Sequence, residues 1–368
     1  MIAAKLKQTA VVAGIWLAMA ASAWAAPPES EAKPQLDAQS QNAVLEALAR
    51  QIEANYIFPD TASQTIAALK DKAQRGAYRE MRSSEQFAAA LTEDLRRLAG
   101  DKHFRLEFAP SFTPEGNTVP STEQVAEERK DVAQMAWGIR RVERLAGNVG
   151  YLDLRGFPPS YLVGPAYQSV LSLLSGTDAL ILDLRQNRGG DPASVAQLLS
   201  YFFAPGDERH LNDIYTRTSN TTRAFWTNPA VSLHYARPVY VLTSSQTFSG
   251  GEECAYDFQT QQRGTLVGET TGGAANPVGP FVLPHGFVVA IPIGRPINPI
   301  TKTNWERVGV KPDVPVEAAK ALETAWRAAL SGLLKEASDP DRRQSLQGVL
   351  ARLDKGELEL PAYRPTKR

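Results

Sequence analysis

The chain has 368 residues, of which 43% are hydrophobic and 22% charged, as in ordinary globular proteins. This length exceeds what one compact core usually holds, so we expect one large domain or two unequal ones. Lysine plus arginine and aspartate plus glutamate each number 40, which leaves no net positive field to attract nucleic acid. The single cysteine, Cys254, excludes an internal disulfide and a cysteine-rich zinc site, and we expect no metal and no cofactor.

The N-terminus has the features of a secretory signal peptide. Lys5 and Lys7 give it a positive start, an apolar run follows over residues 10–21, and Ala-Trp-Ala at 23–25 supplies a small-x-small cleavage pattern. The apolar run is short for a membrane span, so an uncleaved anchor is the weaker alternative. We therefore predict that residues 1–26 are removed. The mature chain would then be exported without a membrane span, most simply to a bacterial periplasm.

Residues 36–98 show a helical pattern, because apolar residues recur at steps of three and four. The pattern breaks at residues 58–60 and near Gly76, which predicts about three helices. We take residues 27–110 as a small helical N-terminal domain. The next segment, 111–146, begins rich in proline, serine and threonine, and we predict a linker followed by a connecting helix.

Strands and helices alternate from residue 147 onward. The first predicted elements are a strand ending at residue 154, a helix over 166–174, a strand over 179–184 and a helix over 192–202. Strand, helix and strand at these spacings favour a largely parallel sheet covered by helices. We take 147–320 as an α/β core and 321–368 as a C-terminal helical tail.

The remaining elements of the core follow in order. They are an excursion over 207–228 that resembles a β-ribbon, a strand over 239–242, a helix to about residue 262, a strand over 265–268, a hairpin over 281–293, a loop over 305–313 and an amphipathic helix over 318–334.

Ser249 stands between a predicted strand and a predicted helix and is followed by Gly250 and Gly251. At such a place a serine hydroxyl meets the first free N–H groups of the helix, which favour a developing negative charge. The same residues also form the pattern Ser249-x-x-Glu252, a capping box that could begin any helix. Position alone therefore leaves a nucleophile and a simple helix cap both open.

A serine nucleophile needs a base, and an imidazole is available from only four histidines. They are His103, His210, His234 and His285. His103 lies in a Gly-Asp turn after a predicted helix, a loop setting suited to function. His210 and His234 lie in or beside the polar excursion, and His285 lies in a predicted hairpin turn. The setting favours His103, but spacing alone does not choose among the four.

Two glycines, Gly189 and Gly190, follow the predicted strand over 179–184. Binding sites in open α/β sheets form at this carboxyl edge, so the amides of this turn and of Gly250 could converge on one carbonyl oxygen. A tight turn that needs positive φ would use two glycines equally well. Neither the GxGxxG nor the GxxxxGK pattern is present, which argues against a nucleotide site.

Several long segments together resemble the tail-specific and tricorn-type serine peptidases, in the branch shared with interphotoreceptor retinoid-binding protein. The segments are GYLDLRGF, LILDLRQNRGG, VYVLTSSQTFSGGEE, VGETTGG and NPITKTNWERVGVKPDV. The similarity runs in order from about residue 36 to about residue 316, so it covers most of the predicted mature chain.

The resemblance implies a crotonase-like spiral of α and β elements preceded by a helical N-terminal domain. It also implies a Ser-His-Glu arrangement, with Ser249 as nucleophile and His103, in a Gly-Asp-x-His-x-Arg-Leu pattern, as base. Glu306, in an Asn-Trp-Glu-x-x-Gly-Val pattern, would orient the imidazole. The implied backbone donors to the oxyanion are Gly189, Gly190 and Gly250.

The sequence also departs from the family pattern. Ala274 stands where the tail-specific branch has a lysine base, so a Ser-Lys dyad is not available. The segment between residues 108 and 147 leaves no room for a PDZ module. Lys102, Phe104 and Arg307 stand where smaller residues are common, and their side chains could narrow the site or tilt the histidine.

The sequence thus predicts an exported serine endopeptidase that cleaves unfolded or peptide substrates through an acyl-enzyme. The alternative is a non-catalytic binding protein of the same fold for a retinoid, fatty acid or other apolar ligand, and a weaker one is an esterase or a peptidase that a partner must open. A peptidase needs an open groove, whereas a lipid binder needs an enclosed apolar cavity of roughly 300–1,000 Å³. The sequence does not give the oligomeric state.

Overall fold

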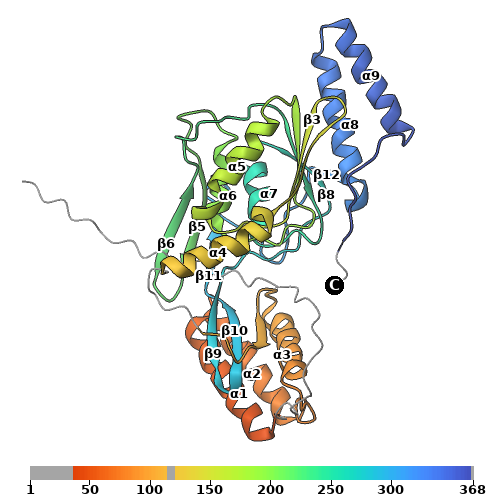
Figure 1. Cartoon of the computed structure of the whole chain (residues 1–368). Helices are drawn as coiled ribbons and strands as arrows, with labels where there is room; N and C mark the ends of the chain where they lie inside the picture. The colour runs from red at the N-terminus through yellow and green to blue at the C-terminus, as the bar shows by residue number, and fades with distance from the viewer. Residues whose placement is uncertain (1–35, 114–120, 366–368) are drawn as a thin grey trace, which may run out of the picture.

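The computed structural model describes residues 36–113 and 121–365, and the predicted signal peptide lies outside them. Figure 1 shows two lobes, a smaller one built on helices α1–α3 and a larger one built on a sheet covered by helices. Within the described ranges, none of the helices combines the length and the apolar character that crossing a membrane requires.

Three helices form most of the smaller lobe, as the periodicity predicts. They are α1 (Ala38–Asn55), α2 (Pro59–Gln74) and α3 (Ser84–Ala99). Local chemistry sets their ends, because Asp37 and Ser83 accept hydrogen bonds from the first turns of α1 and α3, and α2 begins with a proline. Gly100 ends α3 in the left-handed conformation, at φ 65°.

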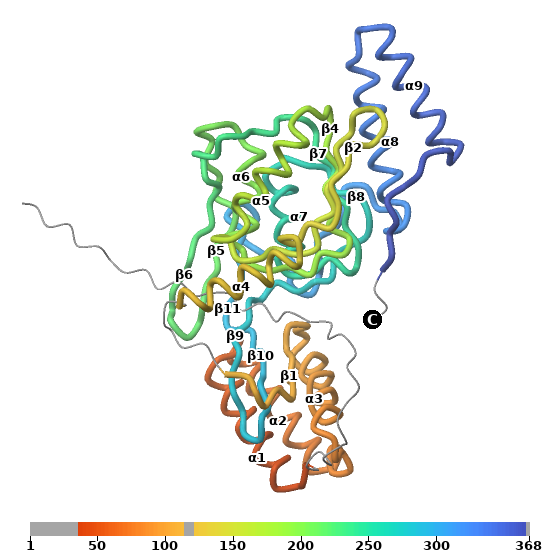
Figure 2. The backbone as a smooth tube through the Cα atoms, in the orientation of Figure 1, coloured from red at the N-terminus to blue at the C-terminus, as the bar shows by residue number. Residues whose placement is uncertain are grey.

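A hairpin from far along the chain completes this lobe. Three strands pair antiparallel in the order β1 (Arg105–Phe108), β10 (Phe287–Pro292) and β9 (Val278–Leu283). Apolar side chains of the hairpin, among them Leu283 and Phe287, are buried in the same cluster as Phe87 and Leu91 of α3. Figure 2 shows the hairpin reaching down from the larger lobe. The smaller lobe is therefore anchored to the larger one by strand pairing as well as by side-chain packing.

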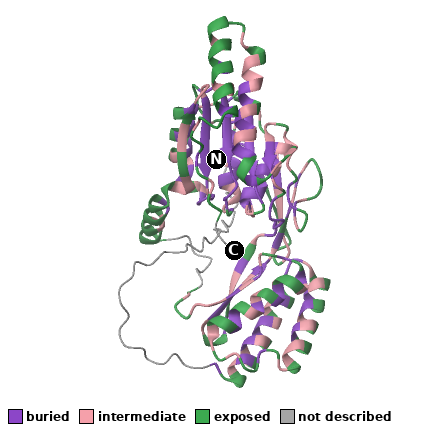
Figure 3. Ribbon diagram, turned by 90° about the vertical axis from the view of Figure 1, so that its right-hand side faces the viewer, coloured by how far each residue is buried: buried purple, intermediate pink, exposed green. Residues whose placement is uncertain are grey.

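The larger lobe contains a six-stranded mixed sheet, which confirms the α/β class and the largely parallel arrangement. Its order is β12 (Val314–Pro315), β8 (Thr265–Gly268), β7 (Val239–Thr243), β4 (Ala179–Asp183), β3 (Val149–Leu154) and β2 (Ile139–Leu145). Neighbouring strands from β12 to β3 run parallel, and β2 pairs antiparallel with β3 at one edge. The strands at the centre of the sheet are buried, and they appear purple in Figure 3.

Helices cover both faces of the sheet, which explains why its central strands are almost continuously apolar. One face packs on α5 (Ser160–Leu174), α6 (Pro192–Ser200) and α7 (Gly250–Thr260), and the other on α8 (Ala318–Glu336) and α9 (Pro340–Asp354). Alternate residues of β4 point to opposite faces of the sheet. Leu180 and Leu182 pack in the cluster with α5, α6 and α7, and Ile181 packs in the cluster with α8 and α9.

The predicted β-ribbon lies beside the sheet. Strand β5 (His210–Thr216) pairs antiparallel with β6 (Thr221–Trp226) and with β11 (Gly294–Ile297). The ribbon carries a register shift between His210 and Asn212. The predicted connecting helix is α4 (Thr122–Gln134), and short 3₁₀ turns occupy Ala136–Gly138 and Pro284–Gly286.

A buried ion pair fixes the carboxyl end of β4. The guanidinium of Arg185, 1% exposed, donates to both carboxylate oxygens of Asp183 at 2.9 and 2.6 Å. It also donates to the carbonyl of Ala318, at the start of α8, at 2.7 Å. Because β4 leads directly into the glycine turn at 189–190, these bonds help to hold that turn in place.

Candidate active site

Ser249 occupies a sharp turn between β7 and α7, with φ 52° and ψ −124°. A positive φ is uncommon for a residue other than glycine, and such strain persists only where the surroundings impose it. Gly189 packs directly against this turn, since a Cβ built on it would lie 2.7 Å from both the Ser249 Cβ and the Gly250 nitrogen. The structure forms the capping box with Glu252, and the strained backbone favours a role for Ser249 beyond capping.

The glycine turn brings two backbone amides together. A Cβ on Gly250 would lie 3.0 Å from the nitrogen of Gly190, so these two amides are neighbours. The N–H of Gly189 instead donates to Oδ1 of Asn187 at 2.8 Å. Asn187 is fully buried, and its carbonyl oxygen accepts from the amide of Phe248, which links the turn to the serine. Of the three predicted donors, Gly190 and Gly250 are thus the adjacent pair, and Gly189 shapes the turn.

Glu252 holds the start of α7 against the loop at 271–274. Its buried carboxylate accepts hydrogen bonds from the amides of Ser249, Gly273 and Ala274 at 2.9, 2.6 and 3.0 Å. It also accepts from the hydroxyl of Thr271 at 2.6 Å. Burial raises the pKa of Glu252, although these donors act against the shift. Glu252 therefore positions the serine turn rather than acting on a substrate.

His103 comes from the smaller lobe and reaches the serine turn. Its side chain is 9% exposed, and its ring centroid lies 4.9 Å from that of Phe248, the residue before the serine. Neither ring nitrogen has a hydrogen-bond partner within the described part of the chain. His103 and Ser249 line one cavity of about 250 Å³. Both ring nitrogens are therefore uncommitted, and neither bonds to the Ser249 hydroxyl across the shared cavity in this structure.

The other three histidines lie elsewhere. The ring of His210 stacks on Trp226 at a centroid distance of 4.2 Å and bonds to Asp213 at 2.8 Å. His234 is exposed, and His285 lies in the 3₁₀ turn between β9 and β10. None of these three lines the cavity that holds Ser249. Of the four histidines, His103 is the one that lines the cavity with Ser249.

Two carboxylates flank the His103 ring. Asp101 Oδ1 lies 3.7 Å from His103 Nδ1, too long for a hydrogen bond. One polar side-chain atom from each of Asp101, His103 and Glu306 lies within 4.8 Å of the other two. Glu306 Oε2 accepts from the amide of Ala275 at 2.6 Å, while its Oε1 is buried without a partner in the described chain. Such residue types can bind a divalent cation, but beside a serine they equally serve proton transfer.

The two carboxylates differ in their protonation. Burial, reinforced by the charge of Asp101, raises the pKa of Glu306 to about 7. Burial also acts to raise the pKa of Asp101, but the His103 side chain and a hydrogen bond from Asn276 at 2.8 Å hold it below its ordinary value. At neutral pH Asp101 is therefore ionised, whereas Glu306 is about half protonated.

The long side chains that depart from the family pattern support the His103 loop. Arg307 donates to the carbonyls of Ala99 and Gly100 at 2.6 and 3.1 Å. Lys102 donates to the carbonyl of Gly272 at 2.5 Å. Phe104 is fully buried in the core of the smaller lobe. These side chains fasten the loop to both lobes.

Some supporting residues were not singled out from the sequence. Asp101 stands within the Gly-Asp-x-His pattern, but only the structure shows its carboxylate beside the imidazole. Asn187 stands within the segment before the glycines and gives no local signal of its hydrogen bond to that turn. Asn276 bonds to a residue 175 positions away, a pairing that no local pattern reveals.

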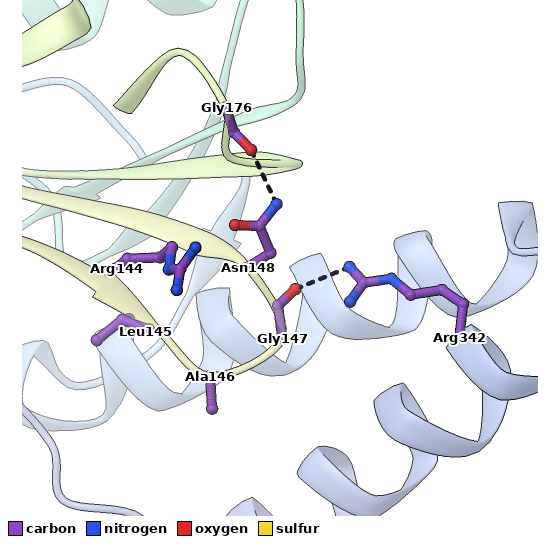
Figure 4. Close-up of a pocket in the computed structure, with 7 residues that line it drawn as sticks. All are labelled: Arg144, Leu145, Ala146, Gly147, Asn148, Gly176 and Arg342. Carbon is purple, nitrogen blue, oxygen red and sulfur yellow. Dashed lines mark hydrogen bonds between the residues drawn. The ribbon is translucent and has the colours of Figure 1, made fainter. Parts of the chain in front are cut away.

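A second depression lies at the opposite end of the sheet. It measures about 490 Å³ and is lined by Arg144, Leu145, Ala146, Gly147, Asn148, Gly176 and Arg342. Figure 4 shows its hydrogen bonds, from the Asn148 side chain to Gly176 and from Arg342 to Gly147. Gly147 and Gly176 precede β3 and β4, so this depression is remote from the carboxyl ends of the strands where Ser249 lies. It has no nucleophile, and it is not the candidate site.

Models of known protein families match residues in both lobes of the chain. Residues 148–316 match the family model of peptidase family S41, and residues 36–136 match that of the N-terminal domain of Peptidase_S41 in eukaryotic IRBP. A carboxyl-terminal-processing protease from Synechocystis sp. is 26% identical over 234 residues, which are 62% of this chain and 51% of the relative. The chain thus aligns with about half the length of that relative.

Solved structures of low sequence identity share the fold. A putative peptidase from Parabacteroides merdae has a TM-score of 0.55 at 18% identity, covering 81% of this chain and 99% of its own. A lipoprotein from Streptococcus agalactiae has a TM-score of 0.51 at 16% identity, covering 79% and 96% respectively. These structures support the mixed α/β architecture alone.

Both matched models describe the class of the peptidases, and in this chain the serine turn and the His103 imidazole line one cavity. Within that class the chain belongs to peptidase family S41 and carries the N-terminal domain of that family.

Proposed function

We propose that the protein is an exported serine endopeptidase that cleaves unfolded or peptide substrates through an acyl-enzyme at Ser249. One observation carries the proposal: His103 from the smaller lobe and Ser249 from the larger one line the same cavity. The amides of Gly190 and Gly250 are neighbours beside that serine. A nucleophile, a base and paired backbone donors are the parts that acyl transfer requires.

Each part has a step in the proposed reaction. His103 takes the proton of the Ser249 hydroxyl as the serine oxygen attacks the carbonyl carbon. The resulting oxyanion accepts hydrogen bonds from Gly190 and Gly250. His103 then gives its proton to the leaving amine, and a water molecule activated by the same imidazole hydrolyses the acyl-enzyme.

The flanking carboxylates stabilise the imidazolium that forms in both steps. Asp101 is the charged partner at neutral pH, because its pKa lies below the ordinary value. Glu306 orients the ring and adds its charge as the pH rises above about 7. We therefore assign Glu306 the role that the resemblance implies and add Asp101 as a positioning residue.

We propose the finer organisation on the same basis. Residues 147–320 form a crotonase-like spiral core, and 27–110 form a helical N-terminal domain whose last loop supplies His103. Residues 111–146 connect the two, 321–368 form a C-terminal tail, and residues 1–26 direct export to the periplasm. The family match over residues 36–136 supports a separate N-terminal domain.

The size of the cavity bears on the alternative of an apolar ligand. Its volume is about 250 Å³. Sites for small molecules usually measure roughly 300–1,000 Å³ and enclose most of the ligand. A cavity of this size fits one amino-acid side chain better than a retinoid or a fatty acid, which favours a peptide substrate.

The test is to label the purified chain with a fluorophosphonate and to digest a disordered protein with it, reading both by mass spectrometry. We expect one added phosphonyl group, on the peptide that contains Ser249, and defined fragments of the substrate. Ser249→Ala should abolish both, while Ser219→Ala, at an exposed serine in the β5–β6 turn, should retain both. Labelling elsewhere, or fragments that persist in Ser249→Ala, would refute the assignment of the nucleophile.

Gly189→Ala tests the backbone donors. The new Cβ would lie 2.7 Å from the Ser249 Cβ and the Gly250 nitrogen, at a φ of +94°, so the turn must move. We expect kcat to fall by about 10²- to 10³-fold, the usual cost of losing one oxyanion donor. Gly176→Ala is the matched control, because a Cβ there meets nothing within 4 Å, and it should leave kcat within a few-fold of wild type. Equal kinetics for the two variants would show that the glycine turn does not bind the oxyanion.

A further inference from the structure

The cavity beside Ser249 combines apolar walls with buried polar groups. Its apolar lining comes from Pro192, Ile214, Ala275, Pro277, Pro296 and Trp305. Its acidic and amide groups come from Asp191, Asn212 and Glu253. Asn212 and Glu253 are only 1% and 4% exposed, so they form the deep part of the cavity. The reaction proposed above does not use Glu253.

Asn212 has an unmet hydrogen-bonding requirement. Its Nδ2 donates to Glu253 Oε1 at 2.9 Å, whereas its Oδ1 is buried without a partner in the described chain. Buried acceptors without a donor are rare and costly, so each one calls for an explanation such as a functional role, a water molecule or an ion. The register shift beside Asn212 is of the kind that re-aims a side chain next to a functional site. A donor that enters this cavity would find a buried amide oxygen ready to accept from it.

The groups around Glu253 decide when its carboxylate is charged. Burial raises the pKa of Glu253 to about 7, against the hydrogen bond from Asn212 and in concert with the charge of Asp191. Asp257 lies one helical turn further along α7, and burial together with Glu253 keeps its pKa well above the ordinary value, so it is neutral. Arg188 also lines the cavity, and its guanidinium bonds to the Gln246 side chain at 3.4 Å.

We propose that this cavity receives the substrate side chain on the amino side of the scissile bond and selects lysine or arginine. The inference rests on the proposed function. The aliphatic stem of such a side chain would lie along the proline and tryptophan walls. Its cationic end would donate to the carboxylate of Glu253 and to Oδ1 of Asn212, a charge-assisted arrangement. Lysine and arginine combine an aliphatic stem for the apolar walls with a cationic donor for the two buried acceptors.

The test compares two peptides that differ only at this position, one with lysine and one with norleucine, an apolar residue of similar length. For the wild-type chain we expect kcat/KM for the lysine peptide to exceed that for the norleucine peptide by about 10- to 100-fold, the worth of a hydrogen bond to a charged group. Glu253→Gln should bring this ratio close to one. Glu208→Gln, at an exposed glutamate outside the cavity, should keep it.

A second readout does not depend on how well the variant folds. The wild-type ratio should rise between about pH 6 and about pH 8, because Glu253 ionises over that range, while a change in the catalytic step itself cancels from a ratio of two peptides. Equal cleavage of the two peptides, cleavage of neither, or a ratio that survives Glu253→Gln would overturn the inference. If fluorophosphonate still labels Ser249 in that case, the proposed function stands and only the selectivity fails. If Ser249 is not labelled, the proposed function itself has failed.

Discussion

Replacing His103 by alanine is expected to lower kcat/KM for peptide cleavage by about 10⁴-fold or more, and Ser249→Ala should cost a similar factor. The reason is that the serine hydroxyl is a weak nucleophile until a base removes its proton. The double variant should lose little beyond either single one, since nucleophile and base act as one unit. Steady-state kinetics of the three variants on one peptide would measure both effects.

The structure offers a sharp control for this experiment. His210 is also partly buried and beside an aspartate, but it stacks on Trp226 away from the cavity, so His210→Ala should stay within a few-fold of wild-type activity. Because the His103 ring is 9% exposed and packs on Phe248, thermal melting of His103→Ala should be measured beside its activity, to separate a loss of folding from a loss of the base. Retention of a tenth or more of the activity would mean that the base lies elsewhere.

The elements of this fold were predictable where their signals are local. The three N-terminal helices follow from apolar periodicity and from breaks at proline and glycine, and the central strands from their apolar runs. The hairpin itself was predicted, but its place was not. It pairs with β1, as in Arg105 opposite Ala290, and no local pattern reveals a partner so distant in the chain.

The candidate site shows the same difference between features with a local sequence pattern and contacts between residues distant in the chain. Ser249, His103 and Glu306 each carry a sequence pattern, and the structure brings the serine and the histidine to one cavity. The contribution of Asp101 depends on a buried position and on Asn276, 175 residues away. Which carboxylate is charged depends on desolvation, and desolvation is a property of the folded state. The sequence therefore could not predict which of the two carboxylates beside His103 is ionised.

Asp101→Asn is expected to lower kcat by about 10³- to 10⁴-fold, the scale found when a carboxylate that stabilises an imidazolium is neutralised. The loss should persist from about pH 6 upward, because the pKa of Asp101 lies below its ordinary value and the carboxylate stays ionised. Asp213→Asn is the matched control, since Asp213 bonds to His210 in an Asp–His pair outside the cavity. It should leave the pH profile of kcat unchanged.

Glu306→Gln should behave differently, and the contrast separates the two roles. With a pKa of about 7, Glu306 is mostly protonated below that pH and ionised above it. Its replacement should therefore cost little near pH 6, and the cost should grow to about tenfold near pH 8, as its charge begins to support the imidazolium. Profiles of kcat against pH for both variants would measure this. A larger loss for Glu306→Gln than for Asp101→Asn near pH 6 would reverse the assignment, because only an ionised carboxylate stabilises the imidazolium there.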